Sequence, residues 1–209
     1  MIELSNGCIC CTLREDLLTS LTALAAEQRF DHVLVESSGI SEPLPVAETF
    51  TFKDKVSGAS LSDVASLHNL VTVVDAASLF GQLGTLDKLT DRGWQATVGD
   101  QRTVANLLCE QVEFADLLLI NKIDLVSDEH REEGVKRLRE INKLAPIVPC
   151  QKAIVPMSEL LNIRAFDLSR VLELEPDFLE DSASLARVLV GFRSLLAARS
   201  VHMRVPRAS

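Results

Sequence analysis

Short apolar runs alternate with longer segments of helical periodicity along this chain. Four runs rich in apolar and β-branched residues have the pattern of buried strands: residues 32–35, 70–74, 117–120 and 147–148. The helical segments between them begin at recognisable caps, such as the Thr-x-x-Glu box that starts at Thr12 and Ser127 with the two acids that follow it. One of these helices is expected over residues 101–114. Strands that are apolar throughout and alternate with helices are typical of a parallel sheet covered on both faces. The pattern therefore predicts an α/β fold whose sheet is mostly parallel with helices on both faces.

Polar sequences follow the first three predicted strands at the point where each strand ends. Residues 36–39 are Glu-Ser-Ser-Gly, Asp75 ends the second strand, and residues 121–124 are Asn-Lys-Ile-Asp. In open parallel sheets, ligands bind at the carboxyl ends of the strands. The placement of these motifs therefore predicts a ligand site at that edge of the sheet. Residues 81–100, with four glycines, are expected to form a long loop that is flexible or faces a partner.

The Asn-Lys-Ile-Asp sequence has the chemistry needed to recognise guanine. The Asp124 carboxylate can accept hydrogen bonds from the ring N–H and the exocyclic amine, while the stem of Lys122 can lie along the base plane. Adenine offers no such pair of donors, so the same carboxylate would lose its solvent without gaining a partner. The alternative is an ordinary solvated turn between a strand and a helix. Its position after Leu-Leu-Leu-Ile in an α/β chain favours guanine binding.

The Glu-Ser-Ser-Gly sequence offers a second part of a nucleotide site. An acid at Glu36 can hold a water bound to Mg²⁺, and Gly39 can turn its N–H toward a terminal phosphate. The alternative is a polar turn whose groups are satisfied locally.

Three of the five cysteines, Cys8, Cys10 and Cys11, fall within four positions near the start of the chain. Thiolates that close together suit a soft or borderline metal such as zinc, which binds sulfur in tetrahedral geometry. One alternative is a set of buried small hydrophobic side chains, since free cysteine is often buried. Another is a thiol redox pair, which would leave the guanine motif unexplained.

Composition limits the classes of partner and the compartment. A net charge of −9 over 209 residues argues against non-specific binding to nucleic acid or to anionic membranes. No apolar run approaches the roughly 20 residues that span a bilayer, and no signal-peptide pattern is visible. An odd number of cysteines, mostly clustered, favours metal-binding thiols in a reducing compartment over a disulfide framework. We therefore expect a cytoplasmic protein.

Several stretches together resemble the CobW family, which comprises P-loop GTPases related to the hydrogenase and urease metallochaperones. In chain order they are Gly-Cys-Ile-Cys-Cys, Glu-Ser-Ser-Gly-Ile-Ser-Glu-Pro-Leu-Pro-Val, Val-Thr-Val-Val-Asp-Ala, Gln-Val-Glu-Phe-Ala-Asp and Asn-Lys-Ile-Asp-Leu. The resemblance covers about residues 4–180. It implies a GTP-hydrolysing metallochaperone that uses GTP and Mg²⁺ and delivers zinc or cobalt to a client metalloprotein.

The resemblance also implies roles for individual residues. It assigns Cys8, Cys10 and Cys11 to the family's metal site. It assigns Glu36 and Gly39 to the Glu-x-x-Gly switch, and Asn121, Lys122 and Asp124 to the base-specificity motif. Residues 142–153 lie where the last guanine-contacting loop should be, but they carry no sharp signature and are left unassigned.

Two departures from the family pattern concern the ends of the chain. The Gly-x-x-x-x-Gly-Lys phosphate loop is missing, because no Gly-Lys pair occurs in the sequence. We therefore expect an N-terminally truncated P-loop domain, without its first strand, over residues 1–181. Residues 182–209 contain five arginines and no acid, which predicts an atypical tail that is non-native or forms a short helix. The alternative function is a non-enzymatic metal-binding or scaffold protein that has lost nucleotide binding.

Overall fold

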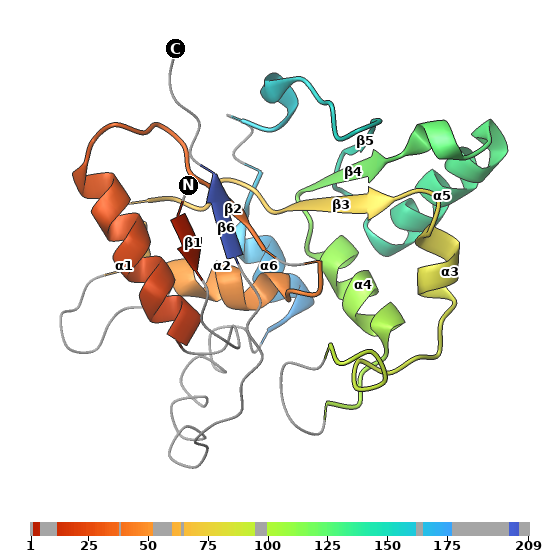
Figure 1. Cartoon of the computed structure of the whole chain (residues 1–209), viewed down its shortest axis with the longest axis horizontal. Helices are drawn as coiled ribbons and strands as arrows, with labels where there is room; N and C mark the ends of the chain where they lie inside the picture. The colour runs from red at the N-terminus through yellow and green to blue at the C-terminus, as the bar shows by residue number, and fades with distance from the viewer. Residues whose placement is uncertain are drawn as a thin grey trace. The chain divides into compact units, whose positions relative to one another are not determined.

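The computed structural model describes residues 2–4, 12–37, 39–51, 60–63, 65–94, 100–161, 165–176 and 201–204. The chain forms two compact units (Figure 1). The first combines Met1–Leu67 with Ser169–Ser209, and the second is His68–Leu168. The predicted boundary at residue 181 falls outside the described residues and stays a prediction.

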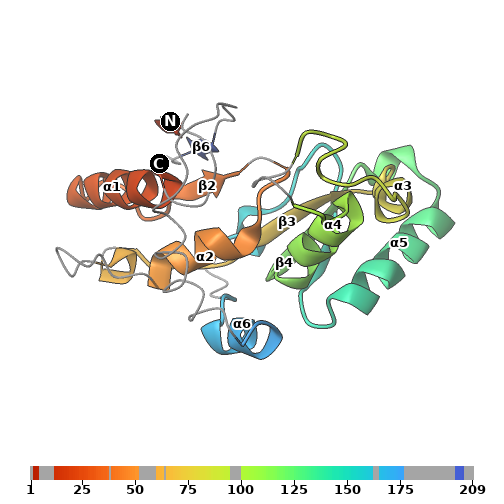
Figure 2. The same cartoon turned by 90° about the horizontal axis from the view of Figure 1, so that it is seen from below.

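The second unit is built around a three-stranded parallel sheet. Its strands are β3 (Val71–Asp75), β4 (Leu117–Asn121) and β5 (Ile147–Pro149), in the order β3-β4-β5. Two α-helices, α3 (Leu79–Leu83) and α4 (Val104–Glu113), connect β3 to β4, and α5 (Asp128–Ile141) connects β4 to β5. Helix α4 packs against α5 (Figure 2). Two 3₁₀ helices, Ile123–Leu125 and Met157–Glu159, complete its regular structure among the described residues. The predicted α/β class is confirmed.

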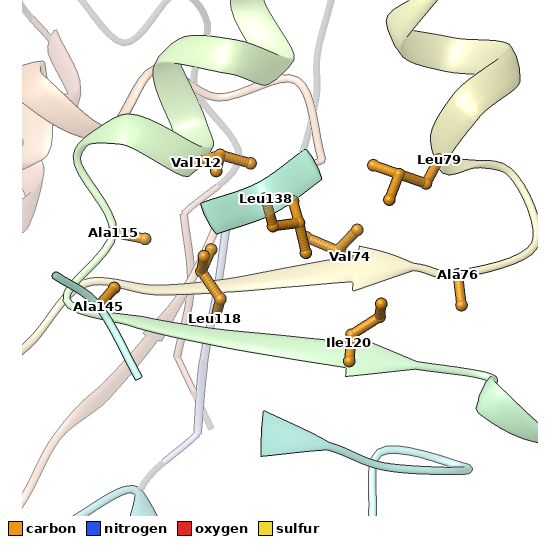
Figure 3. Packing of buried hydrophobic residues seen from close by; sticks show 9 residues of the cluster. All are labelled: Val74, Ala76, Leu79, Val112, Ala115, Leu118, Ile120, Leu138 and Ala145. Carbon is orange, nitrogen blue, oxygen red and sulfur yellow. The ribbon is translucent and has the colours of Figure 1, made fainter. Parts of the chain in front are cut away.

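The core of this unit lies between one face of the sheet and the three α-helices. Val74, Leu118 and Ile120 point from the strands toward side chains of the helices, including Leu79, Val112 and Leu138 (Figure 3). Burying one such aliphatic side chain contributes roughly 1.5–3 kcal/mol. On the opposite face, Leu117, Leu119 and Cys150 pack against Val155 and Leu160. The central strand β4 is buried on both faces, as its unbroken apolar sequence predicts.

Local hydrogen bonds define where the helices begin. Thr103 caps α4, and its side-chain oxygen accepts a bond from the backbone N–H of Asn106 in a capping box. Ser127 caps α5 in the same way, accepting from the N–H of His130 at 3.2 Å. The sequence predicted the cap at Ser127 but began the earlier helix at Gln101, three residues before its observed start.

The segment expected to be a long loop over residues 81–100 is more ordered than predicted. Helix α3 occupies its start, and Leu89 is buried with 1% of its surface exposed. Arg92 donates hydrogen bonds to Asp87 at 2.8 and 3.0 Å and stacks over the Trp94 ring. Glycine content alone suggested mobility, but one buried leucine and one multidentate arginine fix the described part of this segment. Residues 95–99 lie outside the described part.

The first unit contains a three-stranded antiparallel sheet and three α-helices among its described residues. The strands β1 (Ile2–Leu4), β6 (Val201–Arg204) and β2 (Leu34–Glu36) pair in the order β1-β6-β2. Leu17, Leu21, Leu24 and Leu61 form its core. The helices are α1 (Thr12–Ala26), α2 (Pro43–Thr51) and α6 (Leu168–Leu174), and a 3₁₀ turn covers Leu61–Asp63. None of the described helices is long and apolar enough to cross a membrane.

Candidate functional site

The candidate site lies at the carboxyl ends of β3 and β4. Asp75 and Asn121 are the last residues of these strands, and they face each other in the parallel register. The N–H of Ala76 donates to the carbonyl of Asn121 at 3.0 Å, so the pairing continues one residue beyond β3. The Asn-Lys-Ile-Asp sequence therefore begins at a fixed edge of the sheet, as predicted for a ligand site in an α/β fold.

Asn121 connects this edge to the loop that follows β5. Its side-chain oxygen accepts a hydrogen bond from the N–H of Ala153 at 3.0 Å, and the Cys150 thiol approaches the same oxygen at 3.7 Å. The N–H of Ile123 also donates to the carbonyl of Cys150 at 3.4 Å. Residues 150–153, which the sequence left unassigned, are thus held beside the Asn-Lys-Ile-Asp sequence.

The loop that Asn121 holds is conformationally strained. Lys152 and Ala153 have φ values of 52° and 55°, in the left-handed region that favours glycine. They are the central residues of a tight turn closed by a hydrogen bond from the N–H of Ile154 to the carbonyl of Gln151 at 3.0 Å. Positive φ at both central positions is the hallmark of a type I′ turn, usually formed by Asn-Gly. Strain of this kind often accompanies functional sites.

Lys122 has a left-handed backbone and a paired side chain. Its φ and ψ are 60° and 34°, and its ammonium contacts Asp75 Oδ2 at 2.6 Å. Partial burial by itself raises the pKa of Asp75. The hydrogen bond from Lys122, the N–H groups of Ala77 and Ser78 and the charge of Lys122 together outweigh burial, so the pKa lies below its ordinary value. Asp75 is therefore a carboxylate at neutral pH.

Asp124 is exposed in the 3₁₀ turn Ile123–Leu125 and has no hydrogen bond or ion pair to any described residue. The backbone of this turn is fixed by a bond from the N–H of Leu125 to the carbonyl of Lys122 at 3.0 Å. The result is a solvated carboxylate on a defined backbone, next to Lys122. Such a group can accept two hydrogen bonds from a ligand without first breaking a contact within the described chain.

The other predicted site residues belong to the first unit. Glu36 is the last residue of β2 and is exposed, and Gly39 lies in the turn that follows. A Cβ built on Gly39 would meet no atom within 4 Å, so packing does not demand glycine there. Cys8, Cys10 and Cys11 lie outside the described residues. Within the described part of the chain, no group of three His, Cys, Asp or Glu side chains is placed to hold a metal ion.

The sequence pattern placed Asp75 at the expected ligand edge without a role of its own, and it gave no role to Cys150 or Ala153. Asp75 carried a usable signal, because it ends a buried strand beside another strand with a polar end. Ala153 carried no such signal, since neither Lys-Ala nor the neighbouring residues are typical of a turn with positive φ.

A parallel sheet with an Asn-Lys-x-Asp sequence at its carboxyl edge is the arrangement of an α/β nucleotide-binding domain. Residues 1–149 match the family described as CobW/HypB/UreG, nucleotide-binding domain, and the chain belongs to that family.

The chain is also similar to curated proteins with related names. It is 45% identical over 181 residues to zinc-regulated GTPase metalloprotein activator 1 of Dictyostelium discoideum, covering 87% of this chain and 38% of that protein. The Saccharomyces cerevisiae protein of the same name is 31% identical over 83% of this chain and 40% of its own length. Zinc chaperone CobW of a Sinorhizobium species is 33% identical over 67% of this chain and 38% of its own length. The chain thus spans about two fifths of these relatives. No solved structure matches it significantly.

Proposed function

We propose that this chain is part of a zinc-handling GTPase that binds a guanine nucleotide and passes metal to a client metalloprotein. The family match and the zinc- and GTPase-related names of its relatives support this proposal. The observation that carries it is the exposed Asp124 carboxylate beside the fixed Asn121–Lys122 backbone. The expected thiol chemistry requires a reducing compartment, which we propose to be the cytoplasm.

Guanine recognition would fall to Asp124. Its two carboxylate oxygens would accept from the ring N–H and the exocyclic amine of guanine, a donor pair that adenine does not have. Asn121 would act indirectly, by holding the loop that contains Ala153 against the site. Lys122 would present its aliphatic stem to the face of the base.

Phosphate chemistry would fall to the residues that the family resemblance assigns to the switch. Glu36 would accept a hydrogen bond from a water on Mg²⁺, and Gly39 would turn its N–H toward the terminal phosphate. The exposure of Glu36 fits a group that meets a hydrated cation. When bound, Mg²⁺ supplies charge neutralisation for the phosphates.

Metal handling would fall to Cys8, Cys10 and Cys11. Three thiolates leave a tetrahedral zinc ion one ligand short, which suits an ion that is to be passed to a client. These cysteines immediately precede α1, which leads to β2 and then to Glu36 and Gly39. A change in the Glu36-to-Gly39 segment with nucleotide state would therefore alter the thiolate geometry and release zinc, or cobalt in its place.

The decisive experiment combines nucleotide and metal titrations of the purified chain. The proposal expects GTP to bind with Mg²⁺ and more tightly than ATP, and zinc to bind in a manner that Cys10→Ser weakens. Asp124→Ala should lose the preference for guanine but keep zinc binding. Zinc binding without any guanine preference would instead favour the metal-binding or scaffold alternative.

Coupling needs its own measurement. Zinc affinity should differ with and without a non-hydrolysable GTP analogue in a longer relative such as the Dictyostelium protein. Equal affinities would contradict nucleotide-controlled release.

A further inference from the structure

We propose that Asp75 is a positioning residue for guanine recognition, because it holds Lys122 across the carboxyl ends of β3 and β4. This inference rests on the proposed guanine site. Asp75 is not part of the Asn-Lys-x-Asp sequence and comes from a different strand, 47 positions away from Lys122. Its function would be to fix the surface on which the base lies, while Asp124 distinguishes the base.

The Asp75 carboxylate is a preorganised acceptor. One oxygen, Oδ1, accepts from the N–H of Ala77 at 2.9 Å, which fixes the carboxylate against its own turn. The other, Oδ2, is thereby directed at the Lys122 ammonium, 2.6 Å away. Division of the two oxygens between backbone and lysine holds the carboxylate in one orientation.

The position of Lys122 affects more than its own side chain. A left-handed conformation is unfavourable at a residue other than glycine, so other contacts must hold it. The carbonyl of Lys122 accepts from Leu125 and closes the turn that displays Asp124. One residue is therefore fixed to Asp75 through its side chain and supports Asp124 through its backbone. Loss of the ion pair would let the lysine backbone relax and would move the Asp124 carboxylate.

The ion pair also determines where the lysine stem lies. Lys122 directly follows β4, whereas its ammonium is bound at the end of the adjacent strand β3. Neighbouring strands are about 4.8 Å apart, so the four methylene groups must extend across the ends of the two strands. Such a stem offers an apolar surface beside an exposed carboxylate. A purine stacked on this surface would present its edge to Asp124.

The test is an NMR titration of the ¹⁵N-labelled whole chain with GMP and, separately, with AMP. The variant Asp75→Asn keeps the size of the side chain but removes its charge. Asp87→Asn is the matched control, since Asp87 is an exposed acid paired with Arg92 at 2.8 Å in the same unit, outside the candidate site. We expect the wild-type chain to prefer GMP, and Asp75→Asn to reduce the GMP-to-AMP affinity ratio about tenfold. Asp87→Asn should leave this ratio unchanged.

A double-variant cycle separates positioning from general stability. Lys122→Met keeps the apolar stem without the ammonium, so it should lower the ratio as Asp75→Asn does, and combining the two should add little. A wild-type preference for GMP that survives Asp75→Asn would overturn the role of Asp75 and leave the guanine site intact. The absence of any preference in the wild-type chain would overturn both proposals. Melting temperatures measured in parallel identify a variant that has failed to fold.

Discussion

Asn121 and Ala153, 32 positions apart, are joined by a hydrogen bond of 3.0 Å from the backbone N–H of Ala153 to the side-chain oxygen of Asn121. The bond connects the end of the central strand to the loop after β5. A single side chain thus brings together two segments that the sequence presents as separate features.

Replacing Asn121 with alanine should release this loop. Loss of one such bond lowers the free energy of unfolding by about 0.5–1.5 kcal/mol. The more specific measurement is amide hydrogen exchange: exchange at Ala153 should accelerate in Asn121→Ala. The core amide of Leu118, which donates to the carbonyl of Pro146 at 2.9 Å, is the internal control and should stay protected. Unchanged protection at Ala153 would mean that Asn121 does not hold the loop.

Glycine at position 153 should stabilise the chain. Ala153 has a φ of 55°, and glycine adopts that conformation without the steric cost. Ala153→Gly should therefore raise the free energy of unfolding by up to about 1 kcal/mol in a urea titration. Ala77 is exposed and is not among the residues with positive φ, so Ala77→Gly should lower stability instead. Equal effects of the two substitutions would argue against strain at Ala153.

Asn142 should be one of the most sensitive polar positions in the second unit. It is 4% exposed, and its amide nitrogen donates to the carbonyls of Val112, Glu113 and Ala115. Its oxygen accepts from the N–H groups of Leu144 and Ala145. Asn142→Ala leaves these buried groups without partners and should cost about 3 kcal/mol of unfolding free energy.

The variant Asn142→Asp tests the direction of these bonds. Its carboxylate would face the three carbonyl oxygens, so it should be more destabilising at pH 7 than at pH 4, where protonation restores a donor. The exposed neighbour Lys143 is the control, and Lys143→Ala should change stability by less than about 0.5 kcal/mol. A mild effect of Asn142→Ala would contradict the bonding pattern described.

The contribution of the Asp75–Lys122 pair to the free energy of unfolding should be lost on acidification. Because the pKa of Asp75 is lowered in the folded chain, its contribution is fully present above its ordinary value of 3.8. That contribution disappears as the pH falls through the folded-state pKa. The pair is partly exposed, so it should contribute no more than about 1 kcal/mol. The stability difference between wild type and Asp75→Asn should be constant from pH 5 to 7 and shrink below pH 4. A difference that grows on acidification would contradict the direction of the pKa shift.

The sequence predicted the features that depend on the local pattern of residues. It did not predict those that depend on which segments of the chain contact one another in the fold. The apolar run before Asn121 predicted β4 within one residue, and Ser127 predicted the start of α5. The Lys122–Asp75 pair could not be predicted from the sequence, because it depends on β3 and β4 being neighbours in register.

Two other features gave no local signal. Asn142 looked like an ordinary polar residue at a helix end, although it joins two elements in the core. The turn at Lys152 and Ala153 contains none of the residues that favour positive φ. Both depend on tertiary contacts, which the residue type and its neighbours in the sequence do not indicate.

Gly134 should tolerate alanine but not valine. It lies buried in α5, and a Cβ there would meet Leu79 Cδ2 at 3.3 Å and Ile120 Cδ1 at 3.5 Å. Alanine gains up to about 1 kcal/mol in helix propensity, but the Leu79 methyl group must move by a few tenths of an ångström, so Gly134→Ala should be nearly neutral. Gly134→Val adds branches to the same space and should cost about 1–3 kcal/mol.

Gly81, in α3, is the control: a Cβ there meets no atom within 4 Å, so Gly81→Ala should be stabilising. Urea unfolding of the three variants checks the order Gly81→Ala, Gly134→Ala, Gly134→Val from most to least stable, and a stable valine variant would mean that α5 packs less closely on the sheet than described.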